Sequence, residues 1–352
     1  MATAHSTHPL ATVPQRPHAP LIADRSLVAF FGLAFGLSWA LWLVAILGAT
    51  GPAASLAELG ALFGPAVAAA VVSWRVGGLR DWAAGMVHWR APVRWWALAL
   101  GLPLAYVAVW HLGLLLVGSD ALDVSLLTTK AVSYVPLLLV MSLVGGGLNE
   151  EPGWRGFALP RLQQRLSPMR ATLVLGVVWA VWHVPAYVLV AQAGHGLATA
   201  QMTMVLVGSA IEPVAWAVVF TWLYNHTNST LLCILLHGGI NAAFASLLLP
   251  AAALQGDVYL QVALVGNAVV AAGAVALVVA TRGRLGQRVA PPVLRRGGSR
   301  NDDQTPEGEP EQAGRVAGTR GFREGGALRD LAAPPAPDVG RDRRGDRPHV
   351  SR

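Results

Sequence analysis

The sequence has few charged residues, a single cysteine and a single lysine. Only 13% of its 352 residues are charged, whereas a soluble globular domain carries about 25%. Hydrophobic residues make up 54% of the chain, so an ordinary soluble protein is excluded. Because Cys233 is the only cysteine, the chain can form neither an intramolecular disulfide nor a cysteine-rich zinc site. The body of the protein is therefore expected to lie in a lipid bilayer.

The charged residues that are present are concentrated near the C-terminus. Residues 282–352 contain 15 of the 26 basic residues and 10 of the 19 acidic residues. This segment has too few apolar residues to offset the entropy that ordering would cost, so it is predicted to be a disordered, basic cytoplasmic tail. The other arginines lie in short loops beside apolar runs rather than on one soluble patch, so no nucleic-acid partner is expected.

Eight apolar stretches predict a bundle of membrane-spanning helices. Each is near the length of about 20 residues that a helix needs to cross the hydrocarbon. Only a helix or a closed barrel satisfies the backbone within lipid, and the alternating segments of a barrel are absent. The sequence predicts an all-α, polytopic bundle within residues 26–281, after an N-terminal segment at 1–25. The expected spans are residues 27–47, 59–74, 95–117, 131–158, 171–191, 201–224, 230–249 and 259–280.

Arginines in alternate loops predict the orientation of this bundle. They occur before the first span and after the second, fourth and eighth spans, while the intervening loops carry mainly Asp and Glu. Positively charged loops favour the cytoplasmic side. The sequence therefore predicts a multi-pass protein of the cell membrane with both termini in the cytoplasm. The first apolar run is too long for a cleaved signal, so it is predicted to be a retained span.

Ionisable residues are rare within the expected spans, and at such depth they usually serve a function. The densest group is Glu150, Glu151 and Arg155 in the fourth span. Glu151 and Arg155 are four residues apart and can pair on a helix. Glu150 is then left without a nearby cation in the sequence, which suits a general base. Pro152 and the run Gly145–Gly147 predict irregular backbone on either side of the two acids.

Two later spans carry histidines. His183 follows Trp179 by one helical turn, and His237 and Asn241 lie on one face of the seventh span at positions i and i+4. Each motif alone is consistent with packing or with hydrogen bonds between helices. Counted inward from the flanking polar residues, however, Glu150, His183 and His237 lie about 16, 20 and 14 Å deep. The sequence therefore predicts that these three residues and Asn241 line one cavity.

Taken together, the three motifs resemble the CPBP family of intramembrane proteases. This family is related to the type II CAAX prenyl endopeptidases and includes the Abi-like bacterial proteins. The matching elements are Glu-Glu-x-x-x-Arg, aromatic-x-x-x-His and His-x-x-x-Asn, in this order within residues 130–250. The chain departs from the family pattern at Trp179, where the family usually has phenylalanine.

The resemblance implies hydrolysis of a peptide bond in a membrane-associated peptide or protein. By the matching motifs, Glu150 and His183 would activate the attacking water. His237 and Asn241 would hold the oxyanion or complete the water site, and the supporting pair would be Glu151 and Arg155. The residue types suit this chemistry, because amide hydrolysis needs a base for water and hydrogen-bond donors for the oxyanion.

The sequence leaves the use of a metal open. Glu150, His183 and His237 form a three-ligand set for a catalytic Zn²⁺ ion, with water as the fourth ligand. The family is commonly called a metalloprotease family. The alternative is that Glu150 activates water without a metal, and the familiar His-Glu-x-x-His zinc motif is absent from the chain.

Two functions from other classes are also consistent with buried Glu and His residues. A proton- or ion-coupled transporter would use the same side chains, although the internal repeats that many transporters show are absent. A membrane scaffold without activity would not need this set of residues. Three further residues have structural interpretations: Cys233 as a small buried side chain, His111 as a hydrogen-bonding group between helices, and Glu212 as a second acid in the cavity or a cap at a break before Pro213.

Overall fold

The computed structural model describes residues 24–286, and the regular structure within them is entirely helical. The predicted tail at 282–352 lies almost wholly outside the described residues, as does most of the N-terminal segment 1–25. Five helical segments are long and apolar enough to cross a membrane. They are α1 (Arg25–Ile46), α5 (Val93–Leu116), Val124–Val144, which ends with α6 (Leu127–Val144), α11 (Thr199–Thr227) and α13 (Gly256–Thr281).

Two further pairs of helices meet at a bend, and each pair together is long and apolar enough for one broken span or a re-entrant loop. The bend between α2 (Gly51–Leu62) and α3 (Gly64–Arg75) is 47°, and the bend between α9 (Pro168–Trp182) and α10 (Val184–Ala193) is 44°. A proline stands at the start of the second helix of each pair. Proline has no N–H and its ring crowds the preceding turn, so a continuous helix is interrupted there.

The remaining apolar helix, α12 (Thr230–Ala245), has 16 residues and is shorter than an ordinary span. All-helical architecture with many apolar helices confirms the predicted fold class of a multi-pass membrane protein. A short helix, α4 (Leu79–Met86), precedes α5, and single helical turns occupy Val124–Leu126 and Ala251–Ala253.

The span expected at residues 131–158 is not a single helix. The helix α6 ends at Val144, and a new helix, α7 (Gly147–Gly153), begins after Gly145 and Gly146. A π-helical turn (Trp154–Ala158) and α8 (Leu159–Gln163) follow. Gly146 has a φ of 114°, a conformation that glycine adopts without steric strain. The glycines and Pro152 correctly predicted irregular backbone beside the acids, but the irregularity includes a complete break.

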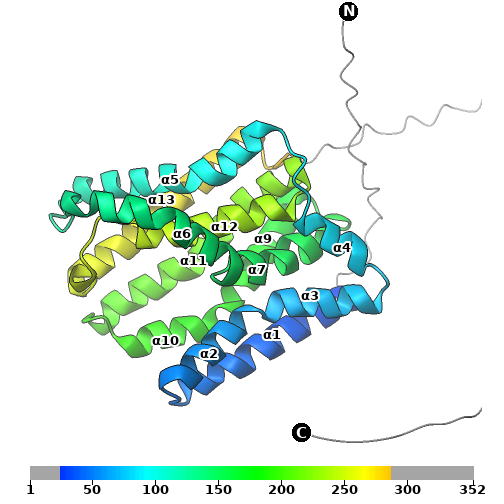
Figure 1. The fold of residues 1–352 in the computed structure, drawn as a ribbon, viewed down its shortest axis with the longest axis horizontal. Helices are drawn as coiled ribbons and strands as arrows, with labels where there is room; N and C mark the ends of the chain where they lie inside the picture. The colour runs from blue at the N-terminus through cyan, green and yellow to red at the C-terminus, as the bar shows by residue number, and fades with distance from the viewer. Residues whose placement is uncertain (1–23, 287–352) are drawn as a thin grey trace, which may run out of the picture. The chain divides into compact units, whose positions relative to one another are not determined.

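The helices that carry the predicted site residues lie in the middle of the bundle (Figure 1). The helix α12 packs against α5, α6 and α7, and α11 packs against α9 and α13. On the opposite side, α1 packs against α2 and α3, and α3 packs against α7. The centroid of the Trp154 ring lies 5.7 Å from that of Phe30 in α1 and 5.7 Å from that of Trp182 in α9. These buried rings pack the π-helical turn that follows α7 against α1 and α9.

Candidate active site

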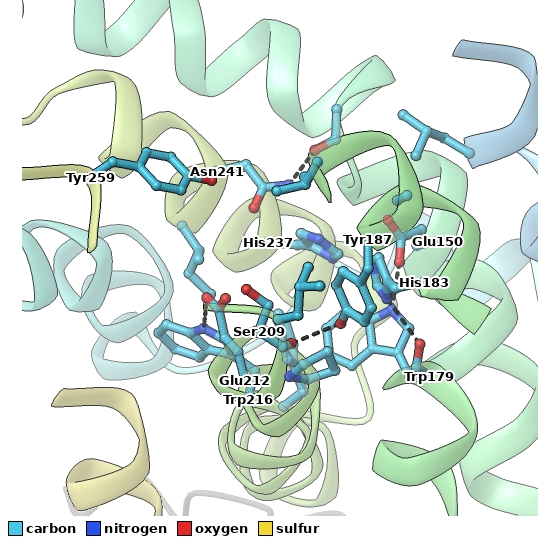
Figure 2. A pocket seen from close by; sticks show the side chains of 18 residues that line it. Glu150, Trp179, His183, Tyr187, Ser209, Glu212, Trp216, His237, Asn241 and Tyr259 are labelled. Atoms are coloured by element: carbon cyan, nitrogen blue, oxygen red, sulfur yellow. Dashed lines mark hydrogen bonds between the residues drawn. The ribbon is translucent and has the colours of Figure 1, made fainter. Parts of the chain in front are cut away.

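Glu150, His183, His237 and Asn241 line one cavity of about 360 Å³ (Figure 2). They come from four places in the fold: α7, the bend between α9 and α10, and two successive turns of α12. The volume lies in the range of about 300–1,000 Å³ that is typical of ligand-binding pockets. The sequence predicted this common location, because the membrane depths estimated from residue spacing are similar for these residues. Their catalytic roles stay a prediction.

Two tryptophan indoles hold the Glu150 carboxylate. Its Oε2 accepts hydrogen bonds from Trp179 Nε1 at 2.7 Å and from Trp154 Nε1 at 3.2 Å. None of the ion pairs of the described residues includes Glu150, as the sequence predicted, but its carboxylate has these two hydrogen-bond donors, which were not predicted. Trp154 is four residues after Glu150, so helical spacing could have identified it, whereas the contact with Trp179 joins two distant helices. Within the described residues Oε1 has no hydrogen-bond donor, so one carboxylate oxygen is fixed and the other is available to a ligand in the cavity.

Glu151 has a different set of partners from its neighbour. Its Oε1 accepts a hydrogen bond from Arg155 Nη1 at 2.8 Å and lies 2.7 Å from Nδ1 of His237. The side chains of both Glu151 and Arg155 are 0% exposed, which confirms the predicted pair. Because an ionised carboxylate only accepts hydrogen bonds, Nδ1 of His237 carries a proton, and Nε2 is an acceptor when the ring is neutral. This contact with His237 was not predicted, because it joins residues on two separate helices.

Aromatic faces enclose the Arg155 guanidinium. Its central carbon lies 4.4 Å from the centroid of Trp179 and 4.2 Å from that of Phe220. A cation over an aromatic face is stabilised by about 2 kcal/mol when both are removed from water. Trp179 therefore contacts two of the three charged groups of the site, donating its N–H to Glu150 and packing its ring face on Arg155.

Gly146 brings the chain that precedes Glu150 into contact with α12. A Cβ atom at this position would overlap the His237 imidazole at Nε2 and the Asn241 amide at Nδ2. The Asn241 Nδ2 group also donates a hydrogen bond to the carbonyl oxygen of Gly145. The two functional groups of α12 therefore depend on the absence of a side chain at Gly146.

His183 lies where α9 ends and α10 begins. Its Nδ1 is 2.9 Å from the carbonyl oxygen of Trp179, which can only accept a hydrogen bond, so Nε2 is the ring nitrogen left for the cavity. The Tyr187 ring stacks on His183 with centroids 5.9 Å apart, and the Tyr187 hydroxyl donates to the Ser209 carbonyl oxygen at 2.7 Å. Tyr187 was not predicted as a site residue, although its position one helical turn after His183 was a usable signal.

The proposed zinc ligands do not form a metal-binding set. Within residues 24–286, no group of three His, Cys, Asp or Glu side chains is arranged to hold a metal ion. Two indole N–H groups bind Oε2 of Glu150, and Nδ1 of each histidine faces a protein acceptor, so Oε1 of Glu150 and Nε2 of each histidine are the atoms left to meet a ligand. As arranged here, these atoms are not gathered into a group that could hold a zinc ion.

The other residues singled out in the sequence have clear positions. His111 Nε2 accepts a hydrogen bond from the backbone N–H of Leu248 at 2.9 Å. Leu248 lies in the loop after α12, so this hydrogen bond joins α5 to a loop, whereas a second helix was predicted. Cys233 is fully buried in the hydrophobic core. Glu212 lines the cavity, and α11 continues through Pro213, so the interpretation of Glu212 as a cap at a helix break is wrong.

Comparison with known proteins identifies the part of the chain that contains the site. Residues 131–243 match the Rce1-like type II CAAX prenyl endopeptidases, and Glu150, His183, His237 and Asn241 all lie within this range. A segment of 52 residues is 40% identical to CAAX prenyl protease 2 of Methanococcus maripaludis. The segment covers 15% of this chain and 18% of that protein, so the similarity spans less than a fifth of the relative. Residues 131–243 are therefore similar to the Rce1-like type II CAAX prenyl endopeptidases, and the rest of the chain lies outside this match.

Proposed function

We propose that the protein is an intramembrane endopeptidase that hydrolyses a peptide bond in a membrane-associated peptide or protein. The observation that best supports this is the location of Glu150, His183, His237 and Asn241 around one cavity, each held by its own protein partner. The family match supports a protease of the CAAX type. It gives no support to a transporter that uses the same residues.

Glu150 is the proposed general base. The two indole donors hold one of its oxygens, so Oε1 can accept a proton from a water molecule in the cavity. The second hydrogen of the same water can bind Nε2 of His183, since Nδ1 of that ring is engaged by the Trp179 carbonyl. Held in this way, the water oxygen directs a lone pair at the substrate carbonyl carbon.

His237 and Asn241 are the proposed donors to the carbonyl oxygen. The Asn241 amide has a second N–H besides the one that binds Gly145. In its protonated form His237 donates through Nε2, while Glu151 stabilises the positive charge at Nδ1. Attack by water forms the C–O bond and moves the carbonyl electron pair onto the oxygen. When the C–N bond breaks, the proton held by Glu150 passes to the leaving nitrogen.

A comparison of membrane peptides tests this proposal. Cells that produce the wild-type chain and cells that produce Glu150→Gln are compared by quantitative mass spectrometry of the membrane fraction. We expect processed peptides that disappear in Glu150→Gln and remain in Glu58→Gln, whose carboxylate is exposed on α2. Their uncleaved forms are then incubated with the purified full-length protein in lipid nanodiscs. Cleavage that is unchanged in Glu150→Gln, or the absence of any Glu150-dependent product in both assays, would contradict the proposal.

A further inference from the structure

A second cavity adjoins the one that contains Glu150. It has a volume of about 370 Å³ and is lined by residues of α5, α11, α12 and α13. The two cavities share several lining residues, so they are neighbouring parts of one space. The shared residues are Ser209, Glu212, Ile240, Asn241 and Tyr259.

Glu212 is an acid common to both cavities, and the reaction described above does not use it. Figure 2 shows its carboxylate across the cavity from Glu150, with His237 drawn between the two acids. Its Oε1 accepts a hydrogen bond from Trp216 Nε1 at 3.2 Å. Within residues 24–286 no lysine or arginine lines either cavity, and none of the ion pairs includes Glu212. Glu212 is partly buried, and a carboxylate in such a place is stabilised when a cation joins it.

Aromatic rings form much of the remaining wall of the second cavity. They include Tyr106, Trp110, Phe244 and Tyr259. The Tyr106 hydroxyl donates to the carbonyl oxygen of Gly266 at 3.2 Å, and Trp110 Nε1 donates to that of Val262 at 3.0 Å. Because their polar atoms are bound to α13, these two residues offer ring surface to the cavity. Aromatic faces attract cations by their electrostatic quadrupole, and the effect increases away from water.

We propose that Glu212 and the aromatic rings of the second cavity bind a positively charged side chain of the substrate, a lysine or an arginine near the bond that is cleaved. Trp216 holds one carboxylate oxygen of Glu212, and the other is available to an ammonium or guanidinium group. The rings of Tyr106 and Trp110 stabilise the same charge. As a determinant of substrate choice this site rests on the proposed protease function, but binding of a cation can be measured without cleavage.

The binding test uses benzyltrimethylammonium and its uncharged isostere neopentylbenzene. The purified full-length protein is titrated with each compound, and its melting temperature in detergent is recorded. We expect the cation to raise the melting temperature of the wild type and of Glu150→Gln, and the isostere to have a much smaller effect. Glu212→Gln should bind the cation at least tenfold more weakly, while the surface variant Glu58→Gln should match the wild type. An equal response of Glu212→Gln and wild type would overturn the inference.

The specificity test uses a library of peptides prepared from a digested proteome and identifies the cleaved bonds by mass spectrometry. We expect lysine or arginine at one fixed distance from the bond in the wild type. In a cleaved sequence, replacing this basic residue by norleucine should lower kcat/KM of the wild type at least tenfold. For Glu212→Gln, the kcat/KM values of the basic peptide and the norleucine peptide should be nearly equal. Glu150-dependent cleavage without a basic preference would overturn the inference and leave the protease proposal intact. Cation binding at Glu212 without any cleavage would sustain the site and contradict the protease proposal.

Discussion

At the scale of single residues, Trp179 is the position at which the chain departs from the motif that it otherwise matches. The family usually has phenylalanine here, and a phenylalanine could supply the ring face over Arg155 but not the N–H that binds Glu150. The tryptophan therefore adds a hydrogen bond that positions the proposed base. A hydrogen bond to a charged group contributes about 1.5–3 kcal/mol.

We expect Trp179→Phe to lower kcat about 10- to 100-fold with a much smaller change in KM, because the lost hydrogen bond orients the base rather than the substrate. Kinetics on a cleaved peptide measure both constants. Trp182→Phe is the matched control, since Trp182 is also fully buried but its Nε1 has no hydrogen-bond partner within the described part of the chain. A kcat for Trp179→Phe that equals that of Trp182→Phe would contradict a positioning role.

Glu150 and Glu151 are adjacent, but neutralising them should have different consequences. Glu151→Gln leaves the Arg155 charge fully buried without its counter-ion, which we expect to cost about 3–5 kcal/mol of unfolding free energy. In Glu150→Gln the side-chain carbonyl can still accept from both indoles, so the protein should stay folded and lose cleavage. Denaturant unfolding in detergent micelles gives the two free energies. Greater destabilisation by Glu150→Gln than by Glu151→Gln would show that the roles are reversed.

The arrangement of the site residues also predicts how the protein responds to chelators. Since Glu150, His183 and His237 do not form a metal-binding set, Glu150-dependent cleavage should be unchanged after dialysis against EDTA or addition of 1,10-phenanthroline. The assay is the initial rate of cleavage by the purified protein. Inhibition by both chelators that is reversed by added Zn²⁺ would contradict the metal-free proposal.

At the scale of helices, the site residues occur where regular helix is interrupted. Glu150 follows the break at Gly145–Gly146 and precedes the π-helical turn Trp154–Ala158, and His183 is the junction between α9 and α10. Irregular backbone of this kind is tolerated at membrane depth where it lines a cavity. Pro152 and the run Gly145–Gly147 predicted the irregular backbone beside Glu150, because proline removes a helical donor and glycine permits a positive φ. The junction at His183 was not predicted, since residues 171–191 were expected to form one span.

Gly146→Ala tests whether the close approach of α7 to α12 is required. We expect loss of cleavage, because a Cβ atom at this position must displace the His237 ring and the Asn241 amide. Gly48→Ala is a matched control: Gly48 has a φ of 103°, but a Cβ atom there meets no other atom within 4 Å. Both variants place an alanine at a positive φ, so they carry a similar backbone strain. When cleavage rates are compared at the same folded fraction, the difference reports the contact of the added Cβ with His237 and Asn241. Equal rates would show that His237 and Asn241 can move without consequence.

The sequence predicted the helical class, most helix positions and the Glu151–Arg155 pair, since these depend on residues near one another along the chain. It could not predict that Trp179 binds Glu150 or that His237 binds Glu151, because such contacts depend on how separate helices pack. For the same reason the common cavity could be inferred only from estimated depths, and the second cavity beside Glu212 was not anticipated. Within the span expected at 131–158, the sequence predicted irregular backbone at the three successive glycines but not that the helix ends there and a new one begins.

At the scale of the whole molecule, the distribution of arginines predicts which loops face the cytoplasm. Arg90 precedes α5 and Asp120 follows it, and both side chains are exposed. The native Cys233 is fully buried, so a single introduced cysteine can be labelled selectively. In intact cells we expect a membrane-impermeant maleimide to label Asp120→Cys, and to label Arg90→Cys only after permeabilisation. The reverse pattern would place both termini outside the cytoplasm.

The close contact at Gly146 also gives a criterion for sorting related genes. A homologous chain can retain the glutamates, both histidines and the asparagine, and still carry a side chain at the position that corresponds to Gly146. In such a protein the imidazole and the carboxamide would be pushed out of place. We would expect it to be a pseudoenzyme that binds membrane peptides without cutting them. A single backbone position, which carries no functional group, would then separate active proteases from inactive relatives more sharply than the catalytic motifs themselves.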